Sequence, residues 1–229
     1  FPYTTLFRSL IVWMAARSTE VPTVRIADVR SDMDWAYVRL LGVVTRHPSY
    51  DPPSGQLTFW LDDGTGEIRV TAYRPASDQL LEAPRPPAMG DRVSVEGTLR
   101  LRGDFQQLVV SLPDVVRVDR PTPSALAIAD LTGEHMFRRV CLRGQVRDKR
   151  MPYDGLALLT LRDITGAVDV VAEKSLGTPY AAVLTMPVGD YVELCGTVTT
   201  YAGELQVALA ADTVTIARLA PVEIAPLRG

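Results

Sequence analysis

The sequence repeats itself at an interval of about 100 residues, and this constrains the fold more than any other feature. LDDGTGEIRV, which begins at Leu61, matches LRDITGAVDVV, which begins at Leu161. GDRVSVEGTL at Gly90 matches GDYVELCGTV at Gly189, so the two offsets differ by a single residue. Solenoid repeats are about 20 to 50 residues long, so an interval of this size indicates a duplicated domain.

The duplication sets the expected domain limits. The first copy is predicted at residues 23–119 and the second at residues 125–217, followed by a tail at 218–229. The connector DRPTPS, at residues 119–124, contains two prolines and is typical of a short, stiff linker.

Within each copy the apolar residues alternate with polar ones, which is the period of a β-strand. In the first copy we expect strands at 38–45, 57–62, 68–73, 92–101 and 106–112, with a short helix at 76–83. In the second we expect strands at 140–147, 157–162, 167–173, 191–200 and 204–210, with a helix within 175–186.

Three strands, a helix and two further strands predict a five-stranded Greek-key barrel, the OB-fold. The predicted fold class is therefore all-β with short helices, as two tandem OB-fold barrels. Gly42 and Gly144 lie in the middle of strands, where a small barrel must coil sharply. Asp63 opens the DGTG turn and is expected to bond its own backbone there.

The motifs VRLLGVV, FWLDDGTGEIRV and GDRVSVEGTL resemble the OB-fold family of anticodon-binding and helicase-type nucleic-acid-binding domains. VCLRGQV, LTLRDITGAVDVV and GDYVELCGTV resemble it equally, so the resemblance covers residues 23–217. It implies a non-enzymatic protein that binds single-stranded nucleic acid on the barrel face. OB barrels also serve as protein-interaction modules, because a fold does not fix an activity.

Charge and composition restrict the kind of site. The formal net charge is −3 and basic residues form no block, so a nucleic-acid site would have to be a local patch. The two histidines and two cysteines are too few and too scattered for a zinc motif. The sequence has no Walker loop, GxSxG or HExxH. We therefore expect no metal, cofactor or catalytic residue.

The binding face implied by the resemblance places three side chains of the first copy together. Trp60, Arg69 and Tyr73 point away from the apolar residues that alternate with them. Aromatic rings there would stack on bases, and cations would follow the phosphates. The flanking loops add Arg46, Tyr50, Arg100, Arg102 and Phe105. In the alternative interpretation, Trp60 packs against another part of the chain and the arginines form salt bridges.

The second copy departs from this pattern. Asp169 stands where the first copy has Arg69, and Glu173 stands where it has Tyr73. Equal binding by both copies is therefore not expected, and the second copy would bind through its first loop or be chiefly structural. Its candidate residues are Arg143, Arg147, Lys149, Arg150, Tyr153 and Arg162.

The two cysteines align with a pair of opposite charges. Cys141 corresponds to Arg39, and Cys195 corresponds to Glu96. The first and fourth strands of an OB barrel pair, so each pair is predicted to consist of cross-strand neighbours. In an oxidising compartment Cys141 and Cys195 would form a disulfide, and otherwise they would be two buried thiols.

The N-terminus carries two further expectations. FPYTTLFRS, residues 1–9, resembles a translated sequencing adapter, as in a metagenomic fragment, and we set it aside. Residues 10–16 are apolar and precede Arg17, which indicates a truncated membrane anchor within residues 1–22. In the alternative, translation begins at Met14. An anchor would favour a membrane-tethered, extracytoplasmic module that binds a protein or carbohydrate, and without it a cytoplasmic address is expected.

Overall fold

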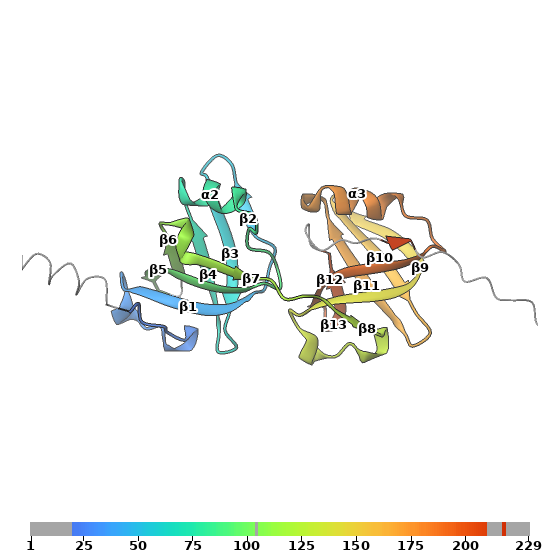
Figure 1. The fold of residues 1–229 in the computed structure, drawn as a ribbon, viewed down its shortest axis with the longest axis horizontal. Coiled ribbons are helices and arrows are strands. Elements are labelled where there is room, and N and C mark those ends of the chain that lie inside the picture. Colours follow the sequence, from blue (N-terminus) through green and yellow to red (C-terminus); the bar gives the residue numbers. More distant parts are fainter. Residues whose placement is uncertain (1–19, 104, 210–216, 219–229) are drawn as a thin grey trace, which may run out of the picture. The chain divides into compact units, whose positions relative to one another are not determined.

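The computed structural model describes residues 20–103, 105–209 and 217–218, which form two units, each built on a β-sheet that curls into a ring (Figure 1). The strands of the first sheet end at Asp119, and those of the second begin at Ser124. We call the two rings the first barrel and the second barrel and describe each by itself.

The first barrel has the strand order of an OB-fold. Strand β1 pairs with β3, β3 with β4, β4 with β6 and β6 with β5, and β5 returns to β1 to close the ring. Strands β4 and β6 run parallel, and the β3–β4 and β5–β6 pairs are antiparallel. Its elements are β1 (Tyr37–Val44), β2 (Ser49–Asp51), β3 (Gln56–Asp62), β4 (Glu67–Ala72), α2 (Ala76–Glu82), β5 (Arg92–Arg102), β6 (Phe105–Val110) and β7 (Val116–Asp119).

The second barrel repeats this topology. The ring runs β9, β10, β11, β13, β12 and back to β9, and β11 pairs with β13 in parallel. Its elements are β8 (Ser124–Leu126), β9 (Arg139–Tyr153), β10 (Leu156–Arg162), β11 (Ala167–Glu173), α3 (Thr178–Thr185), β12 (Tyr191–Tyr201), β13 (Glu204–Ala208) and β14 (Ala217–Arg218). The predicted fold of two tandem OB barrels is confirmed.

The barrel interiors are filled by the apolar half of each alternating pattern. Phe59 and Leu61 of β3 are fully buried, whereas Trp60 between them is half-buried on the outer face. In the second barrel Leu159 and Leu161 of β10 take the same inward positions. Burying a side chain of this size stabilises the fold by about 1.5–3 kcal/mol. The same alternation therefore fixes which side chains remain available on the outside.

The mid-strand glycines occupy equivalent places in the two barrels, as predicted. A Cβ on Gly42 would lie 2.5 Å from the carbonyl oxygen of Asp62, and a Cβ on Gly144 would lie 2.7 Å from that of Arg162. Both glycines thus let the first strand of a barrel cross closely over the end of the next strand.

The DxTG turns do more than reverse the chain. Asp63 Oδ2 accepts a hydrogen bond from Ile26 N at 2.8 Å, and Asp163 Oδ2 accepts one from Ile128 N at 2.9 Å. Each aspartate therefore fastens the 3-10 turn of the repeated IAD segment, Ile26–Asp28 or Ile128–Asp130, to its barrel. The sequence predicted the turn role, and this second role emerges only from the structure.

Hydrogen bonding also holds both carboxyls in the charged form. Burial raises the pKa of Asp163, but hydrogen bonds from Ile128, Thr165 and Gly166 outweigh that effect and lower the pKa to about 2. The pKa of Asp63 is lowered by the same balance of burial against hydrogen bonds.

One sequence expectation was wrong. Residues 148–153 were expected in a loop after the first strand of the second copy, but β9 continues to Tyr153 and pairs with β10. Asp154 and Gly155 connect the two strands, and Gly155 has φ +93°. An Asp-Gly pair between strands is a strong hairpin signal, because the tight turn needs positive φ. The short strands β2, β7 and β8 were also not predicted.

The predictions for residues 1–9 and 10–17 lie outside the described residues. Within the part of the chain that the structure describes, no helix is long and apolar enough to cross a membrane.

Candidate nucleic-acid interface

Side chains from four strands form one row across the outer face of the first barrel. Trp60 of β3 is the cross-strand partner of Arg69 of β4, and Arg69 is the parallel partner of Gln107 of β6. Gln107 in turn pairs with Arg100 of β5. The strand register therefore places Trp60 and Arg69, which were predicted to lie together, in one row with Arg100, which was predicted to flank them from a loop.

A groove of about 580 Å³ lies beside this row. The structure brings four predicted site residues into its lining, and three of them come from β5, β6 or the turn between them. The lining residues are Asp34, Trp35, Tyr73, Arg100, Leu101, Arg102, Phe105, Gln107 and Val109.

The aromatic rings of the groove are exposed and are accompanied by guanidinium groups. Trp35 is 64% exposed, and Tyr73 and Phe105 are each 44% exposed. The guanidinium of Arg100 lies over the Trp35 ring, and Cζ of Arg69 lies 5.7 Å from the centroid of Phe105. Such cation–π contacts hold a positive charge beside a ring that still presents surface to a ligand.

Arg69 is held at the edge of this surface. Its Nε is buried and, within the described residues, has no hydrogen-bond partner. A buried donor without an acceptor costs about 1–3 kcal/mol.

Trp35 was missed by the sequence analysis. It lies before β1, outside the strand pattern, and has φ +70°. Its backbone N–H donates to Leu99 O at 3.0 Å, and Asp34 Oδ1 accepts from Leu101 N at 2.9 Å. These bonds attach the segment to β5 and bring the ring to the groove. The sequence feature that could have identified it is a large aromatic residue within the mostly polar stretch SDMDWAY.

Four predicted residues of the first copy are not in the lining of the groove: Trp60 and Arg69, which belong to the row beside it, and Tyr50 and Arg46. Tyr50 donates to Asp78 Oδ1 at 3.0 Å and accepts from Arg74 at 3.0 Å, which connects β2 to the helix α2. Arg46 is exposed in the segment that follows β1. Tyr50 therefore has a structural role in the free protein.

Two predicted cations of the second copy are engaged within the barrel. Lys149 Nζ donates to the carbonyl oxygens of Leu184 and Met186 at 2.6 and 2.9 Å, at the C-terminal end of α3. A lysine there satisfies carbonyl groups that the helix leaves unpaired. Arg143 forms an ion pair with Glu193, its cross-strand partner.

Of the remaining candidates of the second copy, Arg150 and Tyr153 line one groove, whereas Arg147 and Arg162 lie outside its lining. Arg150 pairs with Asp169 at 2.8 Å, so the acid that replaces Arg69 neutralises a nearby cation. Arg147 donates to Gln145 at 3.0 Å, and Arg162 is exposed at the far end of β10. Tyr153 is 65% exposed. The structure thus gathers six predicted residues into a cationic aromatic face on the first barrel: Trp60, Arg69, Tyr73, Arg100, Arg102 and Phe105.

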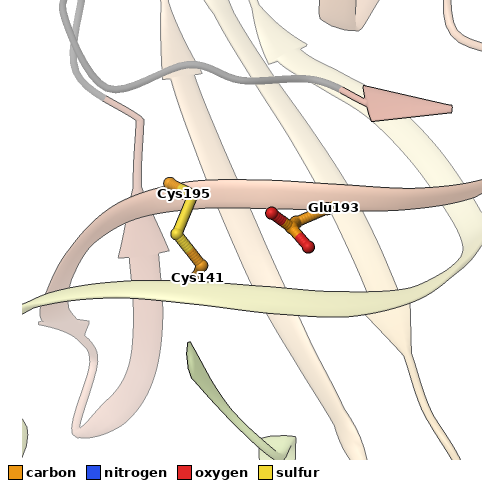
Figure 2. A group of neighbouring side chains, drawn as sticks. All are labelled: Cys141, Glu193 and Cys195. Atoms are coloured by element: carbon orange, nitrogen blue, oxygen red, sulfur yellow. A yellow bond between two sulfur atoms is a disulfide. The ribbon is translucent and has the colours of Figure 1, made fainter. Parts of the chain in front are cut away.

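The two cysteines are cross-strand partners on β9 and β12, as predicted, and their sulfur atoms are bonded (Figure 2). Glu193 lies beside them, and its carboxylate and the two sulfur atoms fall within 4.8 Å of one another. The sulfurs bind each other and Glu193 pairs with Arg143, so the cluster has the chemistry of a disulfide rather than of a thiolate metal centre.

Comparison with protein families gives a match over the second copy. Residues 140–216 match the model described as an OB-fold nucleic acid binding domain. No curated protein matches the chain.

Solved structures of similar fold cover either one copy or both. The tetrameric p202 HIN2 structure has a TM-score of 0.34 and 15% identity, over 81% of this chain and 97% of that chain. A murine DNA binding protein bound with double-stranded DNA has a TM-score of 0.36 and 13% identity, over 82% and 99%. Asparaginyl-tRNA synthetase from Pyrococcus horikoshii has a TM-score of 0.37 and 19% identity. The match covers 46% of this chain and only 24% of the synthetase chain.

Proposed function

We propose that this chain is a non-enzymatic protein whose first barrel binds single-stranded nucleic acid along the groove between Trp35 and Phe105. The observation that carries the proposal is the row of Trp60, Arg69 and Arg100 across the barrel beside three exposed aromatic rings. Stacking of bases on such rings contributes about 1–3 kcal/mol per base, and cations alongside contact the phosphates.

The charges of the groove fit a polyanion. Two arginines, Arg100 and Arg102, line it, and Arg69 lies next to Phe105. Among the described residues of the lining, the one carboxylate is that of Asp34, and it already accepts a backbone hydrogen bond. A local excess of cations is thus present although the whole chain has a net charge of −3.

Single strands suit the groove better than duplex because the rings can contact bases only when the bases are unpaired and accessible. Ring stacking tolerates every base, so we expect affinities for different base compositions to differ by only a few fold. Duplex of the same length should bind more weakly, through phosphate contacts alone.

Fluorescence anisotropy with labelled single-stranded oligonucleotides at low salt tests the proposal, with a duplex of equal length as a second ligand. Trp35→Ala and Phe105→Ala should each weaken single-strand binding about tenfold, given the stacking free energy per base. Tyr191→Ala, which removes a tyrosine that is 46% exposed on the second barrel and lies outside the groove, is the matched control. Absence of binding at tens of micromolar protein, or equal losses in the control, would reject the proposal.

A second candidate function is supported by the disulfide. Structural disulfides are typical of oxidising compartments, which favours a module outside the cytoplasm that binds a protein or carbohydrate partner. Determination of the gene sequence upstream of Leu10, together with thiol quantification in the protein purified from its native host, distinguishes the two. An encoded spanning helix and oxidised cysteines would favour this second candidate.

A further inference from the structure

The second barrel has a groove of its own, of about 560 Å³, on the β10–β11 side of its ring. Residues 150–153 of β9, which lie beyond the strand that the sequence predicted, form part of its wall. The lining residues are Arg150, Met151, Pro152, Tyr153, Leu156, Leu158, Asp169, Val171, Glu173, Tyr201 and Gln206.

This groove has the opposite charge to the groove of the first barrel. Its lining has two carboxylates, on Asp169 and Glu173, and a single cation, Arg150. The cation is already paired with Asp169 at 2.8 Å. Glu173, which stands where the first barrel has Tyr73, therefore leaves the groove with an excess of negative charge.

Three large side chains of its walls are mostly exposed to solvent. Met151, Tyr153 and Tyr201 are 61%, 65% and 76% exposed, and all three line the same groove. Large apolar side chains gathered at one place on a surface mark an interaction site. Tyrosine is enriched among the residues that dominate protein interfaces, and methionine adapts its shape to varied partners.

We propose that the second barrel binds an extended polypeptide segment that carries a lysine or arginine beside apolar side chains. The cation of the segment pairs with Glu173, and its apolar side chains pack against Tyr153, Tyr201 and Met151. Nucleic acid is disfavoured because the carboxylates repel phosphates and the one lining arginine is neutralised. This inference about the second barrel does not depend on the proposed function of the first barrel. If both proposals hold, the two copies bind ligands of opposite charge.

Selection of a displayed library of random nine-residue peptides on the immobilised full chain tests this inference. Enriched peptides should contain lysine or arginine flanked by apolar residues. Fluorescence anisotropy of the most enriched peptides, made synthetically, should show a loss of about tenfold or more for the Tyr153→Ala/Tyr201→Ala chain. Glu173→Gln should weaken the same peptides severalfold, and replacement of the peptide's cation by glutamine should abolish that difference.

Two controls separate this groove from the groove of the first barrel. Tyr191→Ala and Trp35→Ala should leave peptide binding unchanged. The inference is overturned if no peptide is enriched, if the enriched peptides are acidic, or if binding survives Tyr153→Ala/Tyr201→Ala. It is also overturned if this double substitution weakens oligonucleotide binding as strongly as Trp35→Ala does, because the second groove would then hold nucleic acid.

Discussion

Arg39 donates to Glu96 Oε1 at 2.6 Å, and this ion pair occupies in the first barrel the positions that the Cys141–Cys195 disulfide occupies in the second. Both pairs connect the first long strand of a barrel to the strand that closes the ring, β1 to β5 and β9 to β12. An ion pair in one barrel and a disulfide in the other thus connect the same two strands at the point where the ring closes.

Reduction of the disulfide should destabilise the second barrel alone. Its cysteines are 54 residues apart, and a cross-link over a loop of this size contributes about 2–4 kcal/mol. Hydrogen exchange followed by mass spectrometry, with and without reductant, should show faster exchange in β9–β13 and unchanged exchange in β3–β6. The first barrel, closed by an ion pair, serves as the internal control. Equal protection of both barrels after reduction would contradict the prediction.

Acid should weaken the attachment of the IAD segment to the second barrel. The pKa of Asp163 is about 2 in the folded protein, below its ordinary value of about 3.9. Because the folded pKa is the lower one, the stabilisation is complete above about pH 4 and is lost as the pH falls toward 2. At neutral pH, Asp163→Asn should lower the free energy of unfolding by about 1–2 kcal/mol relative to the unmodified chain. Urea unfolding across this range should show that this difference becomes smaller as the pH falls.

Asp154→Asn is the matched control for that measurement, because the Asp154 side chain is 92% exposed and only loosely paired with Lys174 at 3.5 Å. Its unfolding free energy should follow that of the unmodified chain at every pH. A deficit of Asp163→Asn that stays constant from pH 5 to pH 2 would count against the assigned role of the carboxyl.

Gly144→Ala should destabilise the second barrel by about 1–3 kcal/mol, because the new methyl group overlaps a backbone atom that cannot move freely. The added Cβ would lie 2.7 Å from the Arg162 carbonyl oxygen. Gly133→Ala is the control, because a Cβ at Gly133 has no neighbour within 4 Å among the described residues. Thermal unfolding of the two variants measures the difference, and equal melting temperatures would show that the strand crossing is looser than described.

Arg100→Ala should reduce the salt dependence of oligonucleotide binding, whereas Trp35→Ala should not. Each phosphate contact contributes about one to the slope of log affinity against log salt, and removing one should lower the slope by about that amount. Stacking releases no counterions, so Trp35→Ala should lower the affinity at every salt concentration and leave the slope unchanged. Anisotropy titrations from about 50 to 200 mM salt provide the slopes. An unchanged slope for Arg100→Ala would show that Arg100 does not contact a phosphate.

Much of the fold could be predicted from the sequence because it depends on local alternation and on comparison between the two copies. Inward Phe59 and Leu61 define the strand faces, and the matching Gly42 and Gly144 define the crossings. The alignment of Arg39 with Cys141 and of Glu96 with Cys195 required only the rule that the first and fourth strands pair. These relations depend on short-range periodicity and on register, which the printed sequence contains.

The tertiary structure alone decided which of the outward side chains act together. Trp35 reaches the groove because its N–H and the side chain of Asp34 bond to β5, a strand more than sixty residues away in the chain. Lys149 is bound by carbonyls at the end of α3, and Arg150 is paired with Asp169, so neither is available as the sequence had indicated. Alternation determines whether a side chain points outward, but its partner there is set by segments remote in sequence, and those contacts form only when the barrel closes.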